Sequence, residues 1–179
     1  MKFKIVFIIL ILPLFVVAQD GWIPYRSPEG GFKIMTKGIF KERLAHAKTE
    51  IGAITVHNLV YQKEETGKTH PVFVVSYYDF PAGSIHSDST ELATKFFEET
   101  ITGAVESING KLIYKNGMNL HGFNGFQWRV NYPDDAGAIK TQAYLVNNRY
   151  YSVSMLTYST SRKNLDANRY FDSFRLIGY

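Results

Sequence analysis

Two neighbouring segments, residues 53–62 and 70–79, limit the fold of this chain more than any other part of it. Both predict β-strands, because β-branched and aromatic residues are concentrated in them and turn-forming residues stand between them. If Thr66 and Gly67 form the turn, the register pairs Tyr61 with Val72, Leu59 with Val74, Val60 with Phe73 and Val56 with Tyr77. Apolar pairs then occur on both faces, so a sheet that contains this hairpin needs a covering layer on each side.

Further strands are predicted before and after this hairpin. Residues 32–35 form a short strand, and residues 41–50 form a polar strand with one face in water. Later strands are expected at residues 111–114, 118–120, 126–132, 140–146 and 150–157, with turns at Asn116–Gly117, Asp134–Gly137 and Asn147–Asn148. The last of these turns places Leu145 opposite Tyr150. Such closely spaced hairpins predict a mainly antiparallel sheet.

Two segments predict helices. Residues 88–107 carry an apolar stripe at helical spacing, which consists of Leu92, Phe96, Phe97, Ile101 and Val105. Asp88 followed by Glu91 resembles a capping box, so we expect Asp88 to cap this helix. A second helix is expected at residues 161–173, and its apolar face consists of Ala167, Tyr170, Phe171 and Phe174. The chain then ends in an apolar tail, which we expect to dock against the sheet.

The order of these elements predicts an α+β fold in a single domain at residues 19–179. We expect one mainly antiparallel β-sheet flanked by helices on both faces, which is an α/β/α sandwich. No internal repeat, linker or low-complexity segment divides the chain, and its length suits one domain with a sizeable core.

The first eighteen residues predict a secretory signal peptide. Lys2 and Lys4 form a basic start, an apolar run follows from Ile5 to Ala18, and small residues stand near its end. The run is shorter than the roughly 20 residues that span a bilayer, which favours a cleaved leader over an N-terminal anchor. We therefore expect the mature protein to be exported to the periplasm or the cell exterior, where it is soluble.

Charge and cysteine content exclude several classes of protein. The chain has 20 Lys and Arg against 16 Asp and Glu, and two of those lysines lie in the leader, so the mature chain is close to neutral. A nucleic-acid binder needs a dense basic stripe, which this composition does not provide. The chain has no cysteine, which excludes disulfides, thiolate metal ligands, a cysteine nucleophile and a lipid-anchored cysteine.

Five segments of the chain resemble small exported bacterial domains of the PsbP-like (PsbP/DcrB) family. These segments are Ser27–Ile34, Thr49–Gly52, Ser76–Pro81, Tyr144–Val153 and Phe171–Leu176. The resemblance covers nearly the whole mature chain, and its motifs are structural. It implies an α/β/α sandwich with an antiparallel sheet that is used mostly for binding rather than for chemistry. No functional residue is carried over, because members of the family bind unrelated partners.

Asp79, His86 and Asp88 are the strongest candidates for a metal site, since they place two carboxylates and one imidazole in one loop. The two aspartates have simpler roles as well, because Asp88 can cap a helix and Asp79 can end a strand. The chain has no HExxH, GxSxG or GxGxxG motif, so no catalytic or cofactor-binding residue is assigned. We predict that the protein binds neither Zn²⁺ nor Mn²⁺ at high affinity.

These observations favour an exported non-enzymatic binding or accessory domain that acts on a protein or envelope component. Such a domain would have no nucleic-acid partner and no lipid anchor, and association with copies of itself is a further option. The alternative is a small hydrolase or metal-dependent enzyme that uses the loop from Asp79 to Asp88. The two hypotheses differ in one geometric respect, because the enzyme requires Asp79, His86 and Asp88 to converge.

Overall fold

The computed structural model describes residues 21–49, 51–65, 70–158 and 166–179, and every structural statement below concerns these residues. The predicted signal peptide, the predicted Thr66–Gly67 turn and the start of the predicted second helix lie outside them. The strands are β1 (Ile23–Ser27), β2 (Phe32–Thr36), β3 (Lys41–Thr49), β4 (Gly52–Gln62), β5 (Val72–Asp79), β6 (Lys111–Leu120), β7 (Phe123–Asn131), β8 (Gly137–Val146), β9 (Arg149–Tyr158) and β10 (Arg175–Leu176). The helices are α1 (Thr90–Ser107), the 3-10 turn η1 (Pro133–Asp135) and α2 (Asp166–Asp172).

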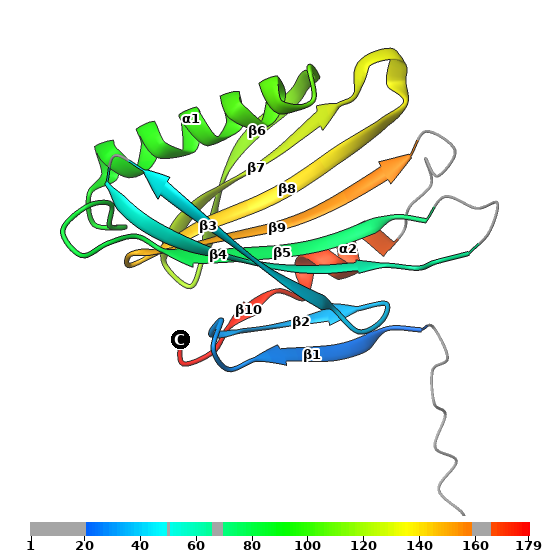
Figure 1. Ribbon diagram of the computed structural model, residues 1–179, viewed down its shortest axis with the longest axis horizontal. Coiled ribbons are helices and arrows are strands. Elements are labelled where there is room, and N and C mark those ends of the chain that lie inside the picture. The colour runs from blue at the N-terminus through cyan, green and yellow to red at the C-terminus, as the bar shows by residue number, and fades with distance from the viewer. Residues whose placement is uncertain (1–20, 50, 66–69, 159–165) are drawn as a thin grey trace, which may run out of the picture.

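Seven of these strands form one large antiparallel sheet with the order β3-β4-β5-β9-β8-β7-β6. The chain builds β3, β4 and β5 side by side and then crosses through α1 to the opposite edge, as Figure 1 shows. It returns by hairpins through β6, β7 and β8 until β9 pairs with β5. The predicted β8–β9 hairpin is confirmed, with Leu145 opposite Tyr150 and Tyr144 opposite Tyr151.

The predicted register of β4 and β5 is wrong by one residue. Val60 lies opposite Val74 and Leu59 lies opposite Val75. β4 ends at Gln62 and β5 begins at Val72, so the connection is longer than the two-residue loop on which the prediction relied. The observed register brings the buried side chains of both strands to the same face of the sheet. Burial of one face determines the register of a strand pair when no short turn does so.

The predicted turn at Asn116–Gly117 is also wrong, because β6 runs through it as one strand. The chain reverses instead at His121 and Gly122, which adopt φ values of 52° and 91°. Two successive positive φ values are what a tight hairpin turn of this handedness requires. The side-chain oxygen of Asn119 accepts a hydrogen bond of 3.0 Å from the backbone N–H of Gly122, which supports the turn.

One face of the large sheet is partly covered by α1 (Figure 1). Phe97 and Ile101 of this helix are buried in a core that also contains side chains of β7, β8 and β9. The Phe97 ring lies 5.2 Å from the Phe126 ring of β7. The predicted apolar stripe is therefore the packing face of the helix, except that Leu92 in the first turn remains 50% exposed. Among the described residues, no helix is long and apolar enough to cross a membrane.

The opposite face of the large sheet is covered by a second sheet, so the predicted single sheet flanked by helices on both faces is wrong. β1, β2 and β10 form a three-stranded antiparallel sheet, which packs together with α2 over the larger one. β1 was not predicted, because the two prolines and three glycines of residues 21–31 indicated an irregular segment. β1 pairs only with β2, and an edge strand of this kind accepts a proline.

The apolar tail docks as predicted, and it does so as a strand. β10 pairs with β2, with Arg175 opposite Lys33 and Leu176 opposite Phe32. Phe174 lies immediately before β10, and its ring centroid is 5.4 Å from that of Phe32. The end of the chain therefore completes both the small sheet and the core between the two sheets.

Candidate functional site

Asp79, the first predicted site residue, is held in a salt bridge at the end of β5. Arg149 lies opposite it at the start of β9. The guanidinium Nε and Nη2 atoms donate hydrogen bonds to the two carboxylate oxygens of Asp79, each 2.6 Å long. This bidentate contact raises the pKa of Arg149 above its usual value. Asp79 therefore serves as the counter-ion of an arginine.

His86 and Asp88, the other predicted residues, contact each other and not Asp79. Nδ1 of His86 lies 3.2 Å from a carboxylate oxygen of Asp88, whose side chain is 86% exposed. The predicted cap is wrong, because α1 begins at Thr90 with Ser89 as its N-cap and has no side-chain capping bond. The carboxylate of Asp88 is turned to His86 and to water instead.

The three predicted ligands do not form a metal site. Within the described ranges, no group of three His, Cys, Asp or Glu side chains is placed to hold a metal ion. The absence of high-affinity Zn²⁺ or Mn²⁺ binding stays a prediction. The enzyme hypothesis depended on the convergence of Asp79, His86 and Asp88, so it loses its local support.

Arg149 also joins the two sheets, a role that the sequence analysis missed. Its Nη1 atom donates a hydrogen bond of 2.8 Å to the backbone oxygen of Glu29, in the turn between β1 and β2. Tyr151, two residues further along β9, donates a hydrogen bond of 2.7 Å to the backbone oxygen of Gly30 in the same turn. The guanidinium lies 5.5 Å from the centre of the Tyr77 ring. One strand of the large sheet, β9, thus fixes a turn of the small sheet that is far from it in sequence.

His57 and Arg149 line a pocket with a volume of about 180 Å³. Glu29, Tyr77 and Asp79 are among its other lining residues. The imidazole stacks on the Tyr77 ring at 4.5 Å. Its Nδ1 atom lies 2.8 Å from Glu42 of β3, and its Nε2 atom lies 4.0 Å from Glu29. Burial, with Glu29 and Glu42 nearby, raises the pKa of Tyr77 to about 12.

Arg149 and Tyr151 connect the two sheets, and the other polar side chains of this cluster pair within the large sheet. Asp79 is neutralised by Arg149, and Glu42 is hydrogen-bonded to His57. A phenol whose pKa is about 12 stays protonated at neutral pH, so Tyr77 is not an activated base. Sequence reasoning missed the cluster because its members come from the β1–β2 turn and from four strands of the large sheet. Only the β5–β9 pairing brings Asp79 and Arg149 together.

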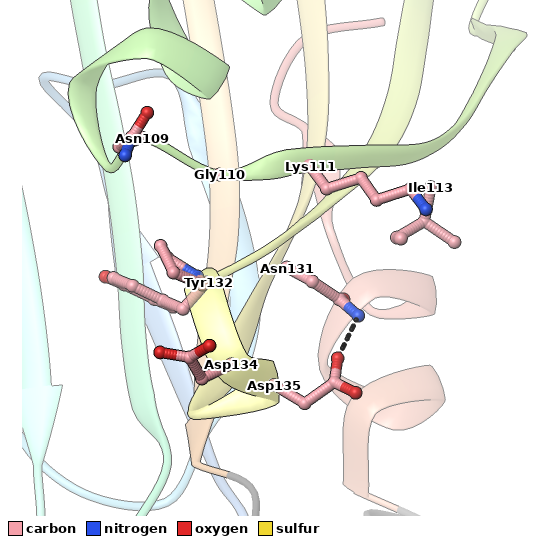
Figure 2. Close-up of a pocket in the computed structure, with 9 residues that line it drawn as sticks. Asn109, Gly110, Lys111, Ile113, Asn131, Tyr132, Asp134 and Asp135 are labelled. Atoms are coloured by element: carbon pink, nitrogen blue, oxygen red, sulfur yellow. Dashed lines mark hydrogen bonds between the residues drawn. The ribbon is translucent and has the colours of Figure 1, made fainter.

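A larger pocket, of about 440 Å³, lies where the end of α1 meets the connection between β7 and β8. Figure 2 shows Asp134 and Asp135 at its rim, pointing in different directions. Asp135 accepts a hydrogen bond of 3.2 Å from the Asn131 side chain, whereas Asp134 is turned towards the other side of the loop. The two carboxylates do not face each other across a cleft, which argues against a shared catalytic role.

The α1 side of the large sheet continues beyond the helix into a half-exposed surface. This surface, which we call the open face, consists of Val56, Asn58 and Val60 of β4, Val72, Val74 and Ser76 of β5, and Ser152, Ser154 and Leu156 of β9. The register places them on the side opposite the core between the sheets, which contains Leu59, Val75 and Val153. Among the described residues, none of the nine belongs to either hydrophobic core.

The open face is uncharged. Its polar groups bond to one another, since Ser76 donates a hydrogen bond of 2.7 Å to Asn58, and the hydroxyls of Ser152 and Ser154 lie 3.3 Å apart. A sheet face in water usually carries polar and charged side chains along its length. Here the valines of β4 and β5 lie beside a strip of hydroxyl groups, and exposed apolar surface of this kind marks interaction sites.

A partial signal for this surface is present in the sequence. The apolar pairs on both faces of the β4–β5 hairpin indicated that each side of the sheet needs a covering layer. Within the part of the chain that the structure describes, α1 is the only helix on this side, and it packs over β7, β8 and the start of β9. The open face is the part of the sheet that the prediction expected to be covered and that α1 does not reach.

Comparison with known proteins shows the fold alone. No family model and no curated protein matches the chain. Among solved structures, the chain is similar to cyanobacterial PsbP from Synechocystis sp. PCC 6803, with a TM-score of 0.55 and 11% identity over 90% of this chain and 95% of that one. At this level of identity the similarity carries no site residue across. The chain therefore has a PsbP-like fold, built from two sheets and two helices.

Proposed function

We propose that the protein is an exported, non-catalytic accessory domain that binds another protein on the open face. One observation carries this proposal, namely the uncharged and partly apolar surface of β4, β5 and β9 that neither core includes. The surface lies on central strands of the large sheet, so it is rigid and preformed. A preformed surface of valines and hydroxyl groups binds a partner without first having to become ordered.

The chemistry of the remaining polar residues supports binding rather than catalysis. In and beside the 180 Å³ pocket, Asp79 bonds to Arg149 and Glu42 bonds to His57, and Arg149 also bonds to the β1–β2 turn of the small sheet. The loop residues of the enzyme hypothesis do not converge. The PsbP-like resemblance also implies a fold that serves mostly for binding. No observation favours a hydrolase over a binding domain.

Site-specific photo-crosslinking in cells tests this function. A photo-crosslinking amino acid in place of Val74, at the centre of the open face, is expected to trap a defined protein partner. The same amino acid in place of Ile23 is the matched control, since Ile23 is an apolar residue on the small sheet and is 43% exposed. A Val74→Arg variant should lose the partner, whereas Ile23→Arg should keep it. Equal trapping at both positions, or none at Val74, would count against the proposal.

Export is a separate part of the proposal and rests on the predicted leader at residues 1–18. We expect cleavage near Ala18 and a mature protein in the periplasm or outside the cell. Mass spectrometry of the protein isolated from those fractions checks this. A mature form that retains Met1 would mean that the leader stays as an anchor.

A further inference from the structure

Strand β3 leaves one long edge of the large sheet without a partner. In the described chain it pairs only with β4, and all nine residues from Lys41 to Thr49 are exposed. The register with β4 continues from end to end without a shift. Natural edge strands are usually kept from pairing by shortness, prolines, bulges or charges. β3 is long, has no proline and has no bulge. Of these four features, only its charges therefore limit which strand can pair with it.

The other edge of the sheet differs in this respect. β6 has a register shift between Leu112 and Tyr114, so Ile113 is a bulged residue. A bulge bends the strand and interrupts the row of backbone groups that an added strand would need. The two edges are thus not equivalent, and only β3 offers a regular backbone edge along its whole length.

The charges of β3 are complementary to those of a second β3 strand that runs antiparallel to it. In a register centred on Ala45, Ala45 faces itself across a two-fold axis and Glu42 of each copy faces Lys48 of the other. Arg43 then faces Ala47 of the partner copy, so no two like charges are opposite each other. Shifting the register to either neighbouring two-fold position removes both Glu42–Lys48 pairs. Opposite charges at facing positions stabilise strand pairing, and like charges destabilise it.

The side chains at the centre of β3 also allow close approach. Ala45 and Ala47 are small and lie on the α1 side, because Ala45 pairs with Val56 of the open face. Glu42 and Lys48 lie on the other side together with Leu44, which pairs with His57. The Glu42 carboxylate bonds to His57 through one oxygen and is 46% exposed, so its other oxygen remains available.

We propose that the protein forms a two-fold homodimer in which β3 of each copy pairs antiparallel with β3 of the other, centred on Ala45. The two large sheets then become one continuous sheet. Paired residues of antiparallel strands point to the same side, so the two open faces lie on the same side of the dimer. The dimer does not depend on the function of the open face, and each can fail without the other.

Cysteine crosslinking tests the register. Because the chain contains no cysteine, a single introduced thiol reports only on its own position. Facing residues of antiparallel strands have Cα atoms about 4.5–5.5 Å apart, within the range that a disulfide spans. Under mild oxidation, Ala45→Cys is expected to give a covalent dimer, because this residue faces itself. Arg43→Cys, the matched control, faces Ala47 and should give none.

Charge reversal tests the pairing without a crosslink. Lys48→Glu places like charges opposite each other in its homodimer, and so does Glu42→Lys, so each variant alone should weaken dimerisation about tenfold or more. An equimolar mixture pairs acidic with basic side chains at both positions and should restore a heterodimer. Sedimentation velocity over a range of concentrations measures both results, and circular dichroism verifies that each variant is folded. Lack of a heterodimer in the mixture would overturn the proposed register.

Two further outcomes would reject the dimer itself. The first is a natural protein that remains monomeric at all concentrations. The second is an Arg43→Cys variant that crosslinks as efficiently as Ala45→Cys, since this would mean that the contact is unspecific. If the natural protein is monomeric but the β3 edge is protected from hydrogen exchange by a partner protein, the edge binds a strand of that partner instead.

Discussion

Phe97 shows how strongly this fold depends on single aromatic side chains. It is 2% exposed, and its ring lies 5.2 Å from Phe126 and 5.5 Å from Phe96. Tyr150 of β9 completes the group, with its ring centroid 6.3 Å from that of Phe97. The same helix presents Leu92 to the solvent, so neighbouring positions of one apolar stripe make very different contributions.

Phe97→Ala is expected to lower the free energy of unfolding by about 3–5 kcal/mol, because it removes a buried ring and leaves a cavity between α1 and the sheet. Leu92→Ala is the matched control on the same helix and should change the free energy by less than about 0.5 kcal/mol. Urea denaturation of the three proteins measures both effects. A loss below about 1 kcal/mol for Phe97→Ala would mean that α1 is not packed as described.

At the scale of elements, two glycines of one hairpin have opposite roles. Gly122 forms the β6–β7 turn with a φ of 91°, which other residues adopt only under strain. Gly117 lies inside β6 at the position where the sequence predicted a turn, and no atom lies within 4 Å of a Cβ built there. Substitution of these two glycines therefore distinguishes the predicted turn from the observed one.

Gly122→Ala should destabilise the protein by about 1–2 kcal/mol, because the new Cβ is strained at a positive φ. Gly117→Ala should leave the stability unchanged or raise it by up to about 1 kcal/mol, since alanine restricts the unfolded chain and meets no clash. Thermal and urea unfolding of the two variants provide the measurement. The reverse order of effects would place the turn at Asn116–Gly117.

How much of each element could be predicted depended on what fixes it locally. The Asn147–Asn148 loop has only two residues, so it determines the β8–β9 register directly, and the prediction was right. The β4–β5 connection is longer, which left the register to be decided by packing. Pro24 argued against a strand at β1, because proline is usually a turn signal. At the edge of a sheet, however, a strand accepts a proline.

The candidate sites were less accessible from sequence than the strands. The side chains around Arg149 are brought together by pairings between distant strands, which no local spacing encodes. The open face was anticipated only as a surface that needs a cover. Whether α1 covers it depends on the position of one helix over seven strands, and this position is a property of the tertiary packing alone.

At the scale of the whole molecule, burial between the layers suppresses the ionisation of several tyrosines. Burial raises the pKa of Tyr78 and of Tyr144 to about 12, and it is the main cause of the similar value for Tyr77. The unfolded chain ionises these phenols near the ordinary tyrosine pKa of about 10. Between these two values the folded protein holds more protons than the unfolded one, so stability falls as pH rises.

We therefore expect the free energy of unfolding to decrease steadily above a pH of about 10. Burial lowers the pKa of Lys140, so this group makes the stability rise with pH just below its usual pKa. The opposite effect of the three tyrosines outweighs it. Urea unfolding at a series of alkaline pH values, together with the tyrosinate absorbance of the folded protein, measures this dependence. Complete ionisation of all tyrosines near the ordinary pKa, in a protein that is still folded, would contradict it.

The position of β10 has a consequence for how the chain is made. β2 (Phe32–Thr36) pairs with β10 (Arg175–Leu176), which follows it by about 140 residues, so the small sheet is incomplete until β10 has been synthesised. A growing chain can build the hairpins of the large sheet before β10 exists. Phe32 of β2, however, lacks its packing partner Phe174 until then. Contacts between such distant residues form late and slowly. Native folding of the small sheet is thereby postponed until β10 has been synthesised.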